Sequence, residues 1–134
     1  MAKFDIWHVA IPVTDLRTSV SFYCEGLGLK LLGYNQDGPR LQAFVKIDSK
    51  NFTLELFQPT ENIEAVLTQK PHHIAFECQD IEELWADLVK RKAIPELKPI
   101  ATFENGVKYL GIKDPDGVAI EFFQGRKIFD SSIS

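Results

Sequence analysis

The chain has 134 residues, 45% of them hydrophobic, and a formal net charge of −4. This length and apolar content predict one compact domain with a hydrophobic core rather than two independent domains. Basic and acidic residues are interspersed along the chain, and phosphate binding needs a concentrated basic patch. The composition therefore argues against a protein that binds nucleic acid.

The N-terminal residues MAKFDIWH lack the basic and apolar regions of a secretory signal. No apolar run approaches the roughly 20 residues that a membrane-spanning helix needs. Cys24 and Cys78 lie far apart in apolar segments, without the spacing of a metal or redox motif, which is typical of buried thiols in a reducing compartment. We expect a cytoplasmic protein with no membrane partner and no disulfide.

The first half of the chain predicts the order β-α-β-β-β. Residues 8–13 are rich in β-forming types, and alternation along this strand predicts His8, Ala10 and Pro12 on one face and Val9, Ile11 and Val13 on the other. An amphipathic helix should follow, capped by Thr14 or Asp15 and ended by Gly26 or Gly28. Turn-forming residues separate the three remaining strands, which are expected at 29–34, 41–47 and 52–58.

The second half predicts the same order after a linker at 59–71, in which one helical turn is expected at 62–67. A strand at 73–78 leads to Asp80, an N-cap with Glu83 as its capping-box partner, and to an amphipathic helix. The remaining strands are expected at 94–99, 107–113 and 118–124, with an Asp-Pro-Asp-Gly turn between the last two.

The two halves also repeat one another residue by residue. His8 corresponds to His73 at an offset of 65 residues, and Glu55 corresponds to Glu121 at an offset of 66. We therefore predict a single domain over 1–134 built from two tandem modules. The modules span 5–58 and 72–125, and residues 126–134 form a polar tail.

The repeated His and Glu residues predict a metal site. Each Glu lies among large apolar residues on a strand, where an ionised carboxylate is costly unless it is paired, hydrogen-bonded or bound to a metal. Imidazole and carboxylate ligands without thiolates suit an open, catalytic Zn²⁺, Ni²⁺, Co²⁺, Fe²⁺ or Mn²⁺ site. The alternative is a set of buried ion pairs without metal. His72 aligns with Trp7, is expected to face away from His73, and is not predicted to be a ligand.

These residues resemble the vicinal oxygen chelate superfamily, whose members pair βαβββ modules around a metal. The resemblance rests on the following segments: His8-Val9-Ala10-Ile11, Phe22-Tyr23, Leu27-Gly28, Leu54-Glu55-Leu56, His73-Ile74-Ala75-Phe76, Asp114-Pro115-Asp116-Gly117 and Ile120-Glu121. It implies an α+β fold in which a curved sheet surrounds a metal cup. A His, Glu, His, Glu ligand set resembles glyoxalase I, which implies His8, Glu55, His73 and Glu121 as ligands.

The resemblance implies an enzyme that converts the thiohemiacetal of a 2-oxoaldehyde into a 2-hydroxyacyl thioester through an enediolate. Glu121, or else Glu55, is the expected catalytic base, and Zn²⁺ or Ni²⁺ the expected metal. The co-substrate is glutathione or another thiol, and Arg17, Arg40 or Lys108 could bind its carboxylate. A homodimer is expected. The alternatives are an epimerase, a thiol transferase, a dioxygenase or a protein that binds an antibiotic or another small molecule.

Overall fold

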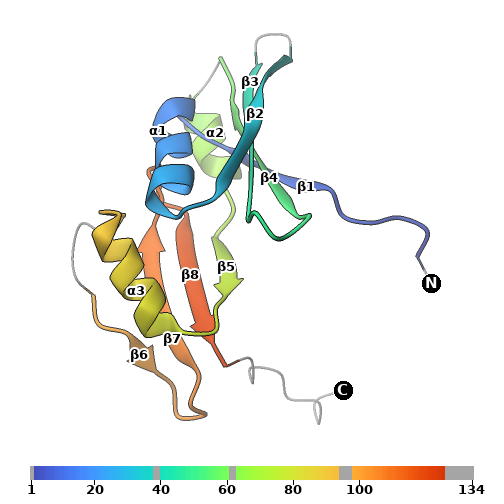
Figure 1. Cartoon of the computed structure of the whole chain (residues 1–134). Coiled ribbons are helices and arrows are strands. Elements are labelled where there is room, and N and C mark those ends of the chain that lie inside the picture. Colours follow the sequence, from blue (N-terminus) through green and yellow to red (C-terminus); the bar gives the residue numbers. More distant parts are fainter. Residues whose placement is uncertain (1, 38–39, 61–62, 94–97, 126–134) are drawn as a thin grey trace. The chain divides into compact units, whose positions relative to one another are not determined.

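A computed structural model describes residues 2–37, 40–60, 63–93 and 98–125 of the chain. The chain forms two compact units, Met1–Pro71 and His72–Ser134, and each contains one module (Figure 1). That the two modules make a single domain stays a prediction. No helix in the described part of the chain is both long and apolar enough to span a bilayer.

The first unit contains a four-stranded sheet with the strand order β1-β4-β3-β2. Strand β1 runs parallel to β4, and the other neighbours are antiparallel. A helix packs against β3 and β4 (Figure 1). The elements are β1 (His8–Pro12), α1 (Leu16–Val20), η1 (Ser21–Gly26), β2 (Lys30–Asp37), β3 (Arg40–Lys46), β4 (Thr53–Gln58) and α2 (Ile63–Gln69).

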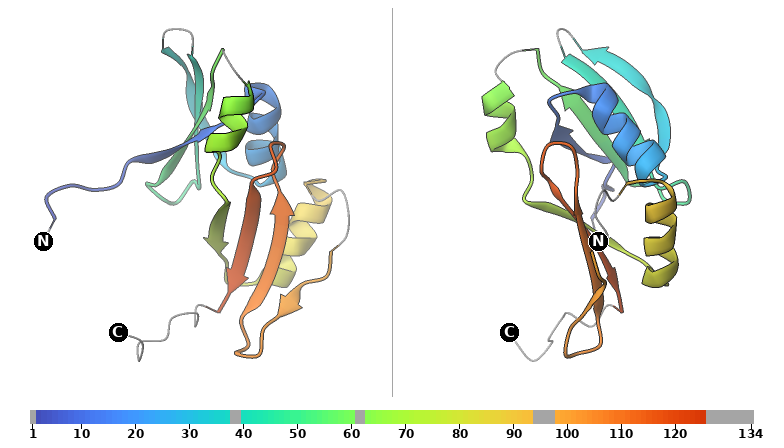
Figure 2. Two further views of the ribbon diagram at one scale, coloured as in Figure 1. Left: turned by 180° about the vertical axis from the view of Figure 1, so that it is seen from behind. Right: turned by 90° about the vertical axis from the view of Figure 1, so that its left-hand side faces the viewer.

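The second unit repeats this topology with the strand order β5-β8-β7-β6. Strand β5 is parallel to β8, and a helix packs against β7 and β8 (Figure 2). The elements are β5 (His73–Glu77), α3 (Ile81–Lys90), β6 (Ala101–Thr102), β7 (Lys108–Lys113) and β8 (Ala119–Gln124). The predicted α+β fold of two tandem βαβββ modules is confirmed.

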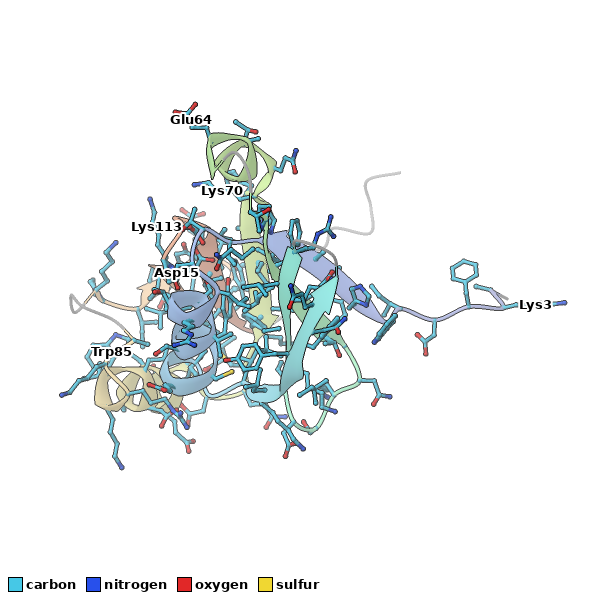
Figure 3. All side chains as sticks on the ribbon, turned by 90° about the horizontal axis from the view of Figure 1, so that it is seen from above. Lys3, Asp15, Glu64, Lys70, Trp85 and Lys113 are labelled. Atoms are coloured by element: carbon cyan, nitrogen blue, oxygen red, sulfur yellow. The ribbon has the colours of Figure 1, made fainter. Side chains whose placement is uncertain are left out.

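The predicted N-caps are present in both units. Asp15 Oδ1 accepts the Thr18 backbone N–H at 3.0 Å, and Asp80 Oδ1 accepts that of Glu83 at 3.1 Å. Such caps satisfy donors that the first turn of a helix leaves free. Figure 3 shows Asp15 at the beginning of α1.

A second contact ties each helix to the last strand of its module. The Gln58 Oε1 atom accepts the backbone N–H of Leu16 at 2.7 Å, and the Gln124 Oε1 atom accepts that of Ile81 at the same distance. Gln58 lies three residues after Glu55, and Gln124 three residues after Glu121. The strand that carries each Glu is therefore fixed directly to the start of the helix.

The helix that begins at α1 widens into π-helical turns over η1. The Leu27 N–H bonds to the Phe22 carbonyl five residues earlier, at 2.9 Å. The chain leaves the helix at Gly28, whose φ of +83° is the left-handed conformation that glycine adopts without steric cost. This agrees with the second of the two predicted end points.

Burial along β1 does not alternate as predicted. Ile11, Pro12 and Val13 are all buried, whereas Val9 is exposed. The C-terminal end of β1 is covered on both faces, so the two-residue period is lost there. The core of both units is otherwise built from aliphatic strand and helix residues, which include Leu54, Leu56, Leu88, Ile112 and Ile120.

The second strand of the second module was predicted at 94–99, and of that range the structure describes only Lys98 and Pro99, neither of which lies in a strand. Residues 94–97 of the predicted strand at 94–99 lie outside the described residues, and the strand that the structure describes is β6 at Ala101–Thr102. The Lys98 carbonyl accepts the Trp85 Nε1–H at 3.0 Å, and Pro99 has no N–H to donate to a ladder. Figure 3 shows Trp85 on α3. The linker helix α2 is present and extends to Gln69, beyond the single predicted turn.

Candidate metal centre

In the first unit the structure brings His8 and Glu55 together. Strand register places His8 opposite Thr53 and Ala10 opposite Glu55, so His8 and Glu55 are diagonal neighbours on one face of the β1–β4 pair. The Nε2 atom of His8 lies 3.6 Å from Oε2 of Glu55.

The second unit contains the same arrangement. His73 pairs with Ala119 and Ala75 pairs with Glu121, which again makes the His and the Glu diagonal neighbours on a parallel strand pair. The His73 Nε2 atom lies 3.6 Å from Glu121 Oε1. In both modules the residue directly beside the Glu on the parallel strand is alanine, whose short side chain leaves room for the imidazole.

The donor atoms of each pair fit a shared metal ion. A charge-assisted N–H···O bond between the two side chains would be about 2.7–2.9 Å long. Two ligand bonds of roughly 2.0–2.2 Å to one cation instead allow donor atoms between about 3 and 4 Å apart, and both pairs lie in that range. Among the residues that the structure describes, no group of three His, Cys, Asp or Glu side chains gathers at one point. Each unit by itself therefore offers two ligands.

Each Glu also accepts a hydrogen bond from the strand on its other side. Gln42 Nε2 donates to Glu55 Oε1, and Tyr109 Oη donates to Glu121 Oε2 at 3.4 Å. Gln42 lies two residues before the partner of Glu55 on β3, and Tyr109 lies two residues before the partner of Glu121 on β7. The two donors occupy equivalent places in the repeat, and in both modules one carboxylate oxygen faces the His while the other is held by this donor.

The two carboxylates differ in how firmly they are held. The Glu55 side chain is 8% exposed, and Gln42 is itself fixed by the Asn35 side-chain amide, which donates to its Oε1 atom at 3.0 Å. The Glu121 side chain is 21% exposed and accepts one long bond from Tyr109. Burial raises the pKa of the Tyr109 phenol, and the charge of Glu121 and the hydrogen bond to it raise this pKa further. Tyr109 is therefore protonated and able to donate at neutral pH.

The surroundings of the two His residues differ as well. His8 lies edge-on against the rings of Trp7 and Phe44, with centroids 4.2 and 5.6 Å away. Its Nδ1 atom is buried and has no hydrogen-bond partner among the described residues. Aromatic packing, rather than a hydrogen bond, therefore orients this imidazole.

His73 instead has a polar neighbour. Its Nδ1 atom lies 2.8 Å from Nδ1 of His72. The prediction that His72 faces away from His73 was wrong, because His72 precedes β5 and is not bound by the alternation of the strand.

A cavity of about 710 Å³ lies in the first unit, lined in part by Asn35, Gln42 and Arg17. It is adjacent to the Glu55 pair through Gln42. Of the three basic side chains expected to bind a carboxylate of the thiol, Arg17 lines this cavity. Lys108 instead pairs with Glu82 at 2.8 Å, and the Arg40 guanidinium lies 4.7 Å from the centroid of the Phe57 ring. Arg17 is thus the one of these three side chains that lies at this cavity, where it shares the lining with the Asp15 carboxylate.

Three polar residues of the site were not predicted to contribute to it: Gln42, Tyr109 and His72. A signal for two of them exists in the sequence, because Gln42 and Tyr109 are offset by 67 residues, close to the offset of the repeat. Finding them required the register of β3 and β7, since the repeat does not keep the residue type at this position.

A family model described as the Glyoxalase/Bleomycin resistance protein/Dioxygenase superfamily matches residues 5–122. The uncharacterized protein YwbC of Bacillus subtilis (strain 168) is 39% identical over 129 residues, which cover 92% of this chain and 99% of YwbC. A lactoylglutathione lyase of Neisseria meningitidis serogroup A is 30% identical over 132 residues, covering 95% of this chain and 94% of that protein. The crystal structure of a glyoxalase family protein from Enterococcus faecalis is similar with a TM-score of 0.71 and 26% identity, covering 92% of this chain and 100% of that chain.

Proposed function

Because the chain belongs to the Glyoxalase/Bleomycin resistance protein/Dioxygenase superfamily, we propose that it is a metal-dependent lyase of the glyoxalase I type. The proposed reaction converts the thiohemiacetal of a 2-oxoaldehyde and a thiol into a 2-hydroxyacyl thioester. The observation that carries the proposal is the identical placement of a His–Glu pair in both sheets, with 3.6 Å between the facing atoms. The relatives named lactoylglutathione lyase support the same reaction.

In this proposal His8, Glu55, His73 and Glu121 hold one divalent cation. Members of the superfamily typically use divalent metals, and two imidazoles with two carboxylates suit Zn²⁺ or Ni²⁺. When bound, the cation supplies a Lewis acid that stabilises negative charge on the substrate oxygens.

Glu121 is the proposed base. It removes the carbon-bound proton of the thiohemiacetal and returns it to the neighbouring carbon, so the reaction is an isomerisation with no net gain or loss of atoms. A base has to change its protonation state and move, and Glu121 is more exposed than Glu55 and is held by one long hydrogen bond. Glu55, with its buried amide partner, suits the role of a fixed ligand.

The thiol part of the substrate is proposed to lie in the cavity beside Gln42. Arg17 supplies a positive charge there for a carboxylate of the thiol, and Tyr34 and Leu41 supply apolar surface. A homodimer with two equivalent sites remains part of the proposal, as does a cytoplasmic location.

The test is metal content, measured by mass spectrometry on protein purified without a histidine tag, together with an assay for methylglyoxal–glutathione conversion. Wild type is compared with Glu121→Gln and with Glu64→Gln, a matched exchange at an exposed position on α2. We expect about one metal per site and activity in wild type and Glu64→Gln, with a loss of activity of at least about 100-fold in Glu121→Gln.

Other outcomes would redirect the assignment. Metal without this activity would keep the centre and point to other thiols, CoA esters or oxygen as reactants. A chain that binds no metal in any of the three forms would contradict the lyase and favour a protein that binds a small molecule without turnover.

A further inference from the structure

The side chain of Tyr109 lies over Gly111, which is two residues further along β7. A Cβ atom built on Gly111 would lie 3.0 Å from the ring carbon Cζ of Tyr109 and closer still to its hydroxyl. Real Cβ atoms do not tolerate such contacts, so any other residue at position 111 would push the phenol away.

The space that Gly111 leaves open lies beside Glu121. Gly111 is the direct cross-strand partner of Glu121 on β7. The Tyr109 hydroxyl occupies this space and lies 3.4 Å from Glu121 Oε2. In the first unit the cross-strand partner of Glu55 is Phe44 rather than a glycine, and the amide of Gln42 is the donor. The tyrosine and the glycine thus form a combination that is specific to the second module.

Two further rings hold the phenol in place. Phe103 is stacked on Tyr109 with centroids 6.0 Å apart, and Phe123 lies at 5.2 Å with a tilt of 47°. Because aromatic contacts restrict the ring, the hydroxyl loses little further freedom when it bonds to Glu121. The donor is therefore positioned before any ligand binds.

We infer that Tyr109, seated over Gly111, is a positioning residue for Glu121. It holds the Oε2 atom and so leaves Oε1 directed toward His73 and toward the cation that this pair would share. The inference rests on the proposed function and deepens it, because it assigns to the second module the residue that orients the proposed base. Partners that orient metal ligands typically contribute 10- to 100-fold to metal affinity or activity.

The test compares three variants of the full-length chain. Tyr109→Phe removes only the hydroxyl, and Gly111→Ala displaces it by adding one methyl group. Gly33→Ala is the matched control, because a Cβ built on Gly33 meets no atom within 4 Å. The readouts are the Zn²⁺ dissociation constant by competition with a chromogenic chelator, the visible spectrum of the Co²⁺-loaded protein, kcat and KM for methylglyoxal–glutathione conversion, and Tm.

Both Tyr109→Phe and Gly111→Ala should weaken Zn²⁺ binding about tenfold. They should also change the Co²⁺ spectrum and lower kcat with little change in KM, whereas Gly33→Ala should match wild type. A normal Tm of Tyr109→Phe separates this effect from a folding defect. If wild type binds metal and turns over substrate but Tyr109→Phe is unchanged in Zn²⁺ affinity, spectrum and kcat, the role of Tyr109 is refuted and the proposed function stands. If wild type binds no metal, both fail.

Discussion

The Nδ1 atoms of His72 and His73 lie 2.8 Å apart, so one imidazole donates its proton to the other. When the His73 Nδ1–H is the donor, the Nε2 lone pair of His73 is free on the side that faces Glu121. A metal-binding imidazole needs this tautomer, and an acceptor at the outer nitrogen stabilises it. In that tautomer His72, although not a predicted ligand, orients His73 for the ligand role that we propose for it.

Replacing His72 with Phe removes the acceptor and keeps a planar ring. We expect the Zn²⁺ dissociation constant to rise about tenfold, measured by competition with a chromogenic chelator. Phe4→Leu is the control, because the Phe4 side chain is 85% exposed. Equal affinities of the two variants would contradict a role for His72 in orienting His73.

When no metal is bound, Gln42→Leu should lower the free energy of unfolding of the protein. The substitution leaves the buried Glu55 carboxylate without its amide donor, and an unsatisfied buried group costs about 1–3 kcal/mol. Asn35, which loses its acceptor, is exposed and can bond to water instead. Urea denaturation measures the loss in the free energy of unfolding.

A double-mutant cycle tests the cause of this loss. In the Gln42→Leu/Glu55→Leu variant the Glu55 carboxylate is absent, so its loss of stability should be clearly smaller than the sum of the losses of the Gln42→Leu and Glu55→Leu single variants. Additive losses would show that Gln42 acts through packing and not through Glu55.

The fold and the pairing of each His with its Glu could be predicted from the sequence because they follow from the repeat and from local strand and turn patterns. The strand that carries Glu121 follows an Asp-Pro-Asp-Gly turn, and each His is marked by its equal place in the repeat. The hydrogen-bond partners of the two Glu residues could not be predicted in this way. Gln42 and Tyr109 reach Glu55 and Glu121 only through the register of antiparallel strands, which residue periodicity does not determine.

The wrong predictions for His72 and for Lys98 and Pro99 have a common physical origin, because these residues lie outside the regular part of a strand. His72 lies before the first residue of β5, where side chains no longer alternate between faces. Lys98 and Pro99 were assigned to a strand, but the Lys98 carbonyl bonds to the indole of Trp85. A side chain from a neighbouring helix thus satisfies backbone that the strand pattern had assigned to a ladder.

Asp15 should make stability depend on pH. A backbone N–H bond from Thr18 holds the pKa of this carboxyl below its ordinary value of 3.8. The folded state therefore gains stability from the ionised cap above pH 3.8, and loses it as the pH falls through the lowered pKa. Asp15→Asn keeps a capping oxygen without this titration. Its Tm should differ most from that of wild type at neutral pH and converge with it in acid, and a difference independent of pH would contradict this assignment.

Cys24 and Cys78 should react slowly with a thiol reagent. Burial raises the pKa of both thiols above the ordinary value of 9.0, with smaller contributions from nearby acidic side chains. The thiolate is the reactive form, so in the native protein at pH 8 both thiols should be modified more slowly than free cysteine. In denaturant both should react at the rate of free cysteine. Ellman's reagent measures this directly. Rapid modification of the native chain would contradict the raised pKa of these partly buried thiols.

The unequal partners of Glu55 and Glu121 bear on the origin of the chain. A duplicated segment begins as two identical halves, and each half here still carries the same His, Ala and Glu at the same register. The donor position has diverged, with an amide in one copy and a phenol over a glycine in the other. The residue opposite each Glu differs too, Phe44 in one copy and Gly111 in the other. Under the proposed function, these differences separate two duties of equivalent carboxylates, a fixed anchor at Glu55 and a movable proton carrier at Glu121.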